Sequence, residues 1–258
     1  MSDLKICIIG SGNVATQMGL ALSRKWQIVE VYSRTEASAS VLAGKLGCTF
    51  TTDIKNLTDD ADVYICSVKD SVLGDLLPQK NFKGKILLHT AGSLPMSVLA
   101  NYTDNIGVLY PLQSISKARE LDFSKVPLLV EASNEKTLSV LKTIANGISN
   151  SVYDVTSEER GMVHLAAVFA SNFTNHMYDI AGSLLADSNL PFDLLLPIID
   201  ETASKVHLMP PSKAQTGPAI RYDRNVIDKH LNMITDERMK KIYELVTEDI
   251  HESLKDKK

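Results

Sequence analysis

The stretch Gly10-Ser11-Gly12-Asn13-Val14-Ala15 decides the fold of this chain. It follows an apolar run at residues 4–9 and opens a helical pattern that extends to about residue 24. In a turn of G-x-G-x-x-A form, the first glycine permits a tight bend and the second lets the backbone approach a pyrophosphate. The small sixth residue allows the helix to pack closely on the strand, and the helix N-terminus offers free N–H groups to phosphate. We therefore expect Gly10, Ser11, Gly12, Asn13 and Val14 to bind a dinucleotide.

Strands and helices alternate after this turn, which predicts right-handed β-α-β units and a doubly wound, mostly parallel Rossmann sheet. The expected helices are at residues 13–24, 36–46 and 134–145, and Gly47 has the position of a C-cap. The expected strands are at residues 4–9, 28–32, 48–51, 62–67, 85–89, 106–110, 126–130 and 151–154.

The second half of the chain has a different pattern, without strands after residue 155. Thr156-Ser157-Glu158-Glu159 is typical of a capping box and predicts a helix to about residue 187. Because this helix is apolar around most of its circumference, we expect it to be buried between domains or between subunits. Helices are also expected at 192–207 and 235–254. The fold class is thus α/β with a second, all-helical domain, divided into residues 1–154 and 155–258.

Composition excludes several classes of protein. The net charge of −4 gives no basic surface for nucleic acid, and no apolar run approaches the length of a membrane span. Cys7, Cys48 and Cys66 form no C-x-x-C pair, so we expect buried thiols in a reducing compartment and no metal site. The N-terminus runs directly into a strand rather than a signal peptide. We expect a cytoplasmic protein that binds neither membrane nor nucleic acid.

The end of the second strand indicates which dinucleotide binds. An NAD site would place Asp or Glu about 20 residues after the turn, but the chain has Tyr32-Ser33-Arg34-Thr35 there. The guanidinium of Arg34 suits a 2′-phosphate, and Ser33 and Thr35 supply hydroxyl donors. We therefore expect NADP; the alternative is that Arg34 is a solvated loop arginine.

Two further strand ends point to the same crevice of the sheet. At residues 66–70 the backbone around Val68 should pass the ribose, while Asp70 has the position of a helix cap. At residues 89–93, Ala91 and Gly92 would allow close approach of a nicotinamide. His89 could contribute to this cofactor site, or it could be a core histidine satisfied by a backbone carbonyl.

The long helix carries polar residues in the stretch 164–175. At 100° per residue, His164, Ser171 and Asn175 share one face, with Asn172 beside them. Buried polar groups need partners, so this stripe either faces a substrate or forms a polar seam between packed helices. In the later segment 216–223, Arg221 could hold a substrate carboxylate, or it could pair with Asp223 and anchor the loop.

These motifs together resemble a known family. GSGNVA, HTAGS, the YPLQS segment at 110–114, HLAAVFASN and TGPAIR-x-D are similar to those of proteins that join a Rossmann-like NADP-binding domain to an all-helical domain of unknown function, number 2520. Such proteins are often described as candidate NADP oxidoreductases, and the resemblance covers nearly the whole chain. More distantly, the chain resembles pyrroline-5-carboxylate reductase, deazaflavin-dependent NADP reductases and β-hydroxyacid dehydrogenases. The resemblance implies a homodimer through the helical domain and an active site between domains.

The chain departs from these relatives at two positions. β-Hydroxyacid dehydrogenases carry K-x-x-N-N on the corresponding helix; matching the Asn pair to Ser171 and Asn172 places Val168 where the lysine belongs. His164, one turn earlier, could replace the lysine as the acid–base group. Relatives often begin the YPLQS segment with His, so no acid–base role is transferred to Tyr110.

We therefore expect an NADP-dependent oxidoreductase that transfers a hydride between the nicotinamide and a small, anionic imine or carbonyl compound. His164 would be the proton donor, Asn172 and Asn175 would orient the substrate or His164, and Arg221 would hold the anionic group. The alternative is a catalytically silent NADP-binding sensor or scaffold, which the missing lysine favours.

Overall fold

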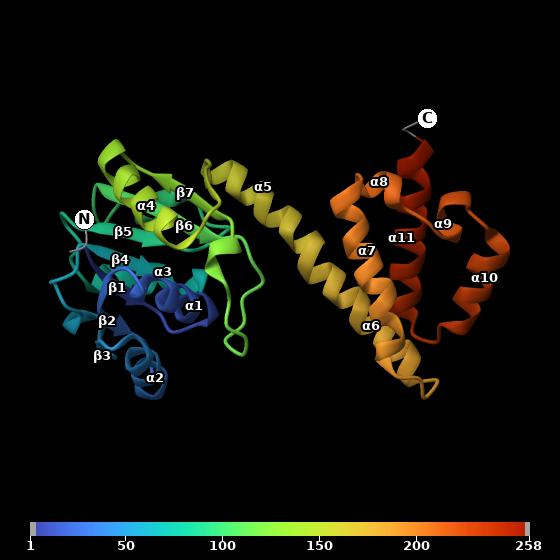
Figure 1. Ribbon diagram of the computed structural model, residues 1–258, viewed down its shortest axis with the longest axis horizontal. Coiled ribbons are helices and arrows are strands. Elements are labelled where there is room, and N and C mark those ends of the chain that lie inside the picture. The colour runs from blue at the N-terminus through green and yellow to red at the C-terminus, as the bar shows by residue number, and fades with distance from the viewer. Residues whose placement is uncertain (1–3, 256–258) are drawn as a thin grey trace. The chain divides into compact units, whose positions relative to one another are not determined.

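A computed structural model describes residues 4–255 of the chain (Figure 1). The chain divides into two compact units, Met1–Asn172 and Phe173–Lys258. The predicted division after residue 154, which separates a cofactor domain from a helical domain, stays a prediction. Each unit is described by itself.

The first unit contains an eight-stranded sheet in the order β3-β2-β1-β4-β5-β6-β7-β8. All neighbouring strands are parallel except β6 and β7, so the predicted mostly parallel, doubly wound α/β sheet is confirmed. The strand order reverses at β1, and the carboxyl ends of β1, β2, β4, β5 and β6 meet at one edge, where ligands of such sheets bind. The strands are β1 Lys5–Ile9, β2 Gln27–Tyr32, β3 Thr49–Thr51, β4 Val63–Cys66, β5 Ile86–His89, β6 Asn105–Pro111, β7 Leu128–Ala132 and β8 Val152–Asp154.

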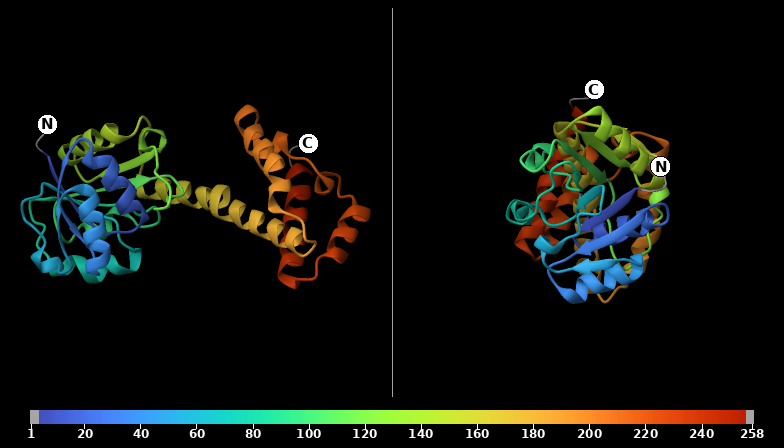
Figure 2. Two further views of the ribbon diagram at one scale, coloured as in Figure 1. Left: turned by 60° about the horizontal axis from the view of Figure 1, so that its bottom comes forward. Right: turned by 90° about the vertical axis from the view of Figure 1, so that its left-hand side faces the viewer.

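Helices lie against the sheet of this unit (Figure 2): α1 Asn13–Ser23, α2 Glu36–Leu46, α3 Asp70–Leu76 and α4 Glu135–Ile148. Successive residues of a strand point to opposite faces, and β1 follows this rule. Ile6 and Ile8 belong to one buried cluster, whereas Cys7 and Ile9 belong to another. Gly47 ends α2 at a φ of 68°, as the sequence predicts, because the left-handed conformation favours glycine. Both faces of the sheet are therefore covered.

The helix α5 Ser157–Ala167 begins at the predicted capping box. Thr156 Oγ1 accepts from the Glu159 amide at 3.2 Å, and Glu159 Oε2 accepts from the Thr156 amide at 2.8 Å. Arg160, in the first turns, is fully buried and donates to Glu131 of β7 and to the Leu94 carbonyl oxygen. A buried guanidinium needs such partners, so these bonds fix the start of α5 on the sheet.

A π-helix at Val168–Phe173 follows α5, and α6 Thr174–Ala186 follows the π-helix. The predicted helix from the capping box to about residue 187 is therefore confirmed in its extent, but its geometry is π-helical rather than α-helical at Val168–Phe173. A π-turn contains about one more residue than an α-turn, and such insertions are frequent at functional sites. The rotation per residue changes there, so a face assigned at 100° per residue does not continue across it.

The second unit is helical throughout its described part. The predicted helices at 192–207 and 235–254 correspond to the 3₁₀ turn Phe192–Leu195 with α7 Leu196–Leu208, and to α11 Glu237–Lys255. The sequence analysis missed α10 Arg224–Met233 and the short helices α8 Pro211–Ala214 and α9 Pro218–Arg221. α10 is amphipathic, with Ile227 buried, so its hydrophobic periodicity is the signal that could have revealed it.

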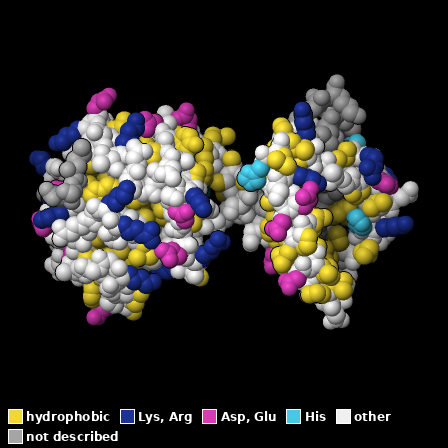
Figure 3. Space-filling model, in the orientation of Figure 1, with side chains coloured by type: hydrophobic (Ala, Val, Ile, Leu, Met, Phe, Trp, Pro, Cys, Tyr) yellow, Lys and Arg dark blue, Asp and Glu magenta, His cyan; other side chains and the backbone are white. Residues whose placement is uncertain are grey.

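Large apolar side chains of α5 and the π-helix are exposed in the single chain. Met162 is 66% exposed, Leu165 50% and Phe169 62%. In Figure 3 hydrophobic side chains reach the surface of both units. These side chains are not buried within the first unit, and the expected burial of the helix between domains or between subunits stays a prediction. Within residues 4–255 no helix is both long and apolar enough to span a bilayer.

His89 ends β5 and is fully buried, with its Nδ1 accepting from the Ala91 amide at 3.1 Å. Burial lowers the pKa of His89 to about 4, and the positive charge of Arg160 acts in the same direction. The folded protein therefore holds a neutral imidazole, while the unfolded chain takes up a proton near pH 6.5. Between these two values the unfolded state binds more protons, so stability falls as the pH falls from about 6.5 to about 4.

The substitution His89→Asn removes this titration and keeps an oxygen near the position of Nδ1. We expect the wild-type protein to lose about 3 kcal/mol more of its free energy of unfolding than this variant between pH 7 and pH 4. Urea unfolding across this range measures the difference, and His176→Asn, at a 57% exposed side chain, is the matched control. Parallel curves for the wild type and His89→Asn would contradict the buried, neutral state.

Candidate functional site

The turn after β1 has the geometry that a phosphate site needs. Gly10 has a φ of 123°, and a Cβ there would lie 2.3 Å from the Ser67 carbonyl oxygen, so only glycine fits. A Cβ built on Gly12 meets nothing within 4 Å, which leaves open space in front of the turn. Gly12 is the N-cap of α1 and no side chain caps this helix. The first N–H groups of α1 are therefore available to an anion.

A cavity of about 330 Å³ extends from this turn across the ends of β2 and β4. It brings together most of the residues predicted for the cofactor, although the turn, Arg34 and Val68 lie far apart in sequence. Asn13 and Val14 form the first turn of α1 beside it, and Ala91 and His89 lie at the end of β5. The cavity is lined by Gly10, Ser11, Gly12, Tyr32, Ser33, Arg34, Thr35, Ser38, Ser67, Val68, Lys69, Val72 and Leu76.

The electrostatics of this cavity suit a phosphorylated ligand. Arg34 and Lys69 are exposed and line it, and no carboxylate does. Ser11 Oγ and Ser33 Oγ are 2.7 Å apart, which joins the turn after β1 to the end of β2. Sequence analysis missed Lys69; its position directly after β4, at the same sheet edge as the turn, is the signal that could have revealed it.

A second cavity, of about 620 Å³, lies elsewhere in the first unit. Tyr110 and the segment after β6 form one wall, and most of residues 163–172, except Leu165 and Phe169, form the other. Tyr110 Oη and His164 Nδ1 are hydrogen bonded at 3.0 Å across it, and either can donate, depending on the protonation of the ring. The predicted acid–base residue therefore has a tyrosine partner, although the sequence analysis assigned Tyr110 no such role.

Gly92 makes room for this pair. A Cβ on Gly92 would lie 2.6 Å from His164 Nδ1 and 2.9 Å from Tyr110 Cζ. The close approach of a nicotinamide to Ala91 and Gly92, expected from the sequence, stays a prediction. Ser67 Oγ and Thr90 Oγ1 are 3.0 Å apart and join the ends of β4 and β5, between the two cavities in strand order.

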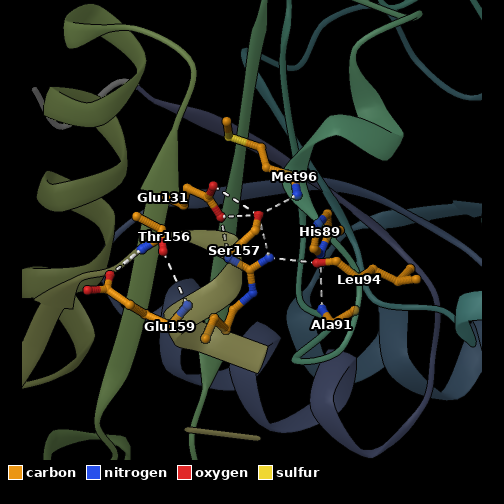
Figure 4. A network of polar contacts seen from close by, with 9 residues as sticks. His89, Ala91, Leu94, Met96, Glu131, Thr156, Ser157 and Glu159 are labelled. Carbon is orange, nitrogen blue, oxygen red and sulfur yellow. Dashed lines mark hydrogen bonds and ion pairs between the residues drawn. The ribbon is translucent and has the colours of Figure 1, made fainter. Parts of the chain in front are cut away.

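A network of charged and polar groups holds the first turn of α5, which precedes His164 in sequence. Arg160 precedes it by one turn, and Ser157 Oγ donates to both carboxylate oxygens of Glu131 at 2.9 and 3.0 Å (Figure 4). The same Ser157 Oγ accepts from the Met96 amide at 3.0 Å. Burial raises the pKa of the Tyr110 phenol. The positive charge of Arg160 lowers this pKa, but by less than burial raises it. Tyr110 is thus a neutral hydrogen-bonding group at physiological pH.

The residues of the predicted polar stripe line two different cavities. Ser171 and Asn172 line the cavity beside His164. Asn175 instead lines a different cavity, with Tyr178, Asp179 and Phe192. The assumption of one common face is wrong because the π-helix Val168–Phe173 lies between His164 and Asn175.

Arg221 lies in α9 of the second unit and is exposed. Among the ion pairs between described residues none involves Arg221, so the suggested pair with Asp223 is not formed. Tyr222, at a φ of 50°, stacks on His251 with ring centroids 4.6 Å apart and anchors this loop instead.

The described chain contains no cluster of three or more His, Cys, Asp or Glu side chains that could hold a metal ion.

Two family models match the chain. Residues 5–92 match the model described as NADP oxidoreductase coenzyme F420-dependent, and residues 126–250 match the domain of unknown function DUF2520. No curated protein matches significantly.

Solved structures give a consistent comparison. A Bacteroides fragilis protein, proposed to be an NADP oxidoreductase, is 49% identical; the match covers 97% of this chain and 99% of that one, with a TM-score of 0.91. An imine reductase from Myxococcus stipitatus, in complex with NADP⁺, is 14% identical over 97% of this chain and 94% of that one, with a TM-score of 0.71. A 1-pyrroline-5-carboxylate reductase from Streptococcus pyogenes is 14% identical over 98% and 100%, with a TM-score of 0.68. The last two share the fold.

The substitution Gly92→Ala tests the packing of the Tyr110–His164 pair. The added methyl group overlaps both rings, so we expect their hydrogen bond to break and the ¹⁵N chemical shift of His164 Nδ1 to change. Gly44→Ala is the matched control, because a Cβ there meets nothing within 4 Å. An unchanged His164 signal in a folded Gly92→Ala protein would contradict the described geometry.

Proposed function

Because this chain belongs to the family of NADP oxidoreductases that carry a DUF2520 domain, we propose that it transfers a hydride between the nicotinamide and a small imine or carbonyl compound. The observation that carries this proposal is the Tyr110–His164 pair. It lies at the carboxyl-end edge of the parallel strands, the same edge that carries the phosphate-binding turn.

The residues of the first cavity fit NADP. The open space in front of Gly12 and the uncapped N-terminus of α1 suit a pyrophosphate. Arg34 and Lys69 would hold the 2′-phosphate together with the hydroxyl groups of Ser33 and Thr35. When NADPH is bound, it supplies the hydride for the reduction.

His164 would supply the proton that this reduction needs. A hydride adds to the carbon of the C=N or C=O bond, and a proton must reach the nitrogen or oxygen. The imidazole is the side chain best suited to proton transfer near neutral pH. Since Tyr110 bonds to Nδ1, it fixes the orientation of the ring and leaves Nε2 for the substrate.

Asn172 and Ser171 would orient the substrate, because both line the cavity beside His164. Asn175 has no part in this proposal, because it lines another cavity. The expected anionic substrate depends on Arg221, which lies outside the cavity residues 110–115 and 163–172; its contact with a substrate stays a prediction.

A homodimer would cover the apolar side chains that the single chain exposes. Met162, Leu165 and Met177 are examples, and exposed apolar patches of this kind mark protein interfaces. We propose that the dimer forms through this helical region. A mass of one chain at every concentration in sedimentation equilibrium would contradict it.

NADPH should bind more tightly than NADH. In Arg34→Ala we expect the affinity for NADPH to fall roughly 10- to 100-fold, because charge-assisted bonds to phosphate are lost, while NADH binding changes little. Calorimetric titration measures both, and Arg24→Ala, an exposed arginine paired with Glu120, is the control. Equal affinity of wild type and Arg34→Ala for NADPH would contradict the role of Arg34.

Single-turnover oxidation of bound NADPH, with a panel of imines, ketones and 2-oxo acids, tests the chemistry. We expect His164→Gln to slow the step roughly 10²- to 10⁴-fold without changing NADPH affinity, because a general acid is removed. Tyr110→Phe should shift the pH profile of the step, and exposed His176→Gln should behave as wild type. Tight NADPH binding with no turnover of any compound by the wild type would instead favour the silent sensor.

A further inference from the structure

We propose that the cavity beside His164 receives an uncharged, apolar substituent of the substrate. The substrate class is therefore neutral ketones and the imines derived from them, with short alkyl or alicyclic groups, rather than 2-oxo acids. This inference rests on the proposed function, names its substrate class, and departs from the anionic substrate that the sequence analysis expected.

The cavity has the size of a small-molecule site. Its volume of about 620 Å³ lies within the range of roughly 300–1,000 Å³ that is usual for ligand pockets. The Tyr110–His164 hydrogen bond lies in its wall, so a group seated in the cavity is next to the acid–base pair. The substituents of the C=N or C=O carbon must then occupy the remaining space.

The walls of that space are mostly small and apolar. Val163, Ala166, Ala167, Val168 and Ala170 form the helical wall, and Leu112 and Ile115 contribute to the opposite wall. The short side chains of the alanines leave room that longer residues would fill. Apolar groups are favoured in such a space because they leave water.

The polar side chains that line the cavity carry hydroxyl or amide groups, apart from His164, the proposed proton donor. No Lys, Arg, Asp or Glu belongs to its lining. The cation nearest along the helix, Arg160, is fully buried and already donates to Glu131 and to the Leu94 carbonyl oxygen. A carboxylate held against the apolar walls of this cavity would lose hydration without gaining a Lys or Arg partner, which is costly.

The first cavity of the same unit shows the contrast. There, Arg34 and Lys69 line the space, together with hydroxyl groups, as expected for an anionic ligand. Cationic side chains therefore line the cavity in which an anionic ligand is expected, whereas no Lys or Arg lines the cavity beside His164. The difference in lining supports a neutral substituent at the second cavity.

A matched pair of carbonyl compounds tests this inference with the full-length protein and NADPH. Butan-2-one and 2-oxobutanoate differ by one methyl group replaced by a carboxylate, and each forms an imine with methylamine. In the reduction the imine carbon gains the hydride of NADPH, the nitrogen gains a proton, and the C=N double bond becomes a single bond. We expect single-turnover reduction of the butan-2-one imine to be at least about tenfold faster.

Binding of the product amines gives a second readout that needs no turnover. We expect N-methylbutan-2-amine to bind at least about tenfold more tightly than N-methyl-2-aminobutanoate in calorimetry with NADP⁺ present. Ala167→Leu, which fills the cavity, should weaken the binding of N-methylbutan-2-amine, the product without a carboxylate, at least about fivefold. Ala203→Leu, at an exposed residue of α7, is the matched control and should bind as wild type.

The outcomes separate this inference from the proposed function. If neither imine is reduced, the oxidoreductase proposal is contradicted. The binding of the two amines would still decide whether the cavity prefers a group without a carboxylate. Faster reduction of the 2-oxobutanoate imine, lost in Arg221→Ala, would overturn the neutral substrate class alone. Unchanged amine binding in Ala167→Leu, with a changed mass in solution, would identify the cavity as a subunit contact and overturn the inference.

Discussion

The ion pair between the buried Arg160 and the partly buried Glu131 is the interaction on which the rest of the candidate site depends. Arg160 belongs to α5 and Glu131 to β7, and Ser157 and the Leu94 carbonyl oxygen complete the partners of the two charges. Removing Glu131 would leave the buried Arg160 guanidinium without its ion-pair partner, typically at a cost of about 3–5 kcal/mol. The start of α5 therefore has one stable position on the sheet, and His164, one turn further, reaches Tyr110.

The parallel sheet provides the second constraint. The turn after β1, the cation after β4 and Gly92 after β5 lie at the same edge because these strands run in one direction. Tyr110, near the end of the parallel strand β6, adds the acid–base pair to that edge. A cationic cavity and a neutral cavity therefore lie in one unit, and each has the lining that its proposed ligand needs.

The sequence predicts those features that local chemistry determines. The GSGNVA turn, the capping box at Thr156 and the C-cap at Gly47 each need particular residues within a few positions, and all three have the expected form. The Tyr110–His164 contact joins residues 54 positions apart, and no local pattern indicates it. Arg160 likewise resembles any helical arginine until the fold buries it. The π-helix changed the face of Asn175 because the periodicity argument assumes regular α-helix throughout.

If reduction takes place beside the Tyr110–His164 pair, the product must bind there. A crystal structure of the protein with NADP⁺ and N-methylbutan-2-amine shows where it binds. We expect the amine nitrogen within hydrogen-bonding distance of His164 Nε2, the alkyl group against Ala167, and the 2′-phosphate on Arg34. An amine bound away from the cavity of residues 110–115 and 163–172, or a nicotinamide directed away from the end of β5, would contradict this expectation.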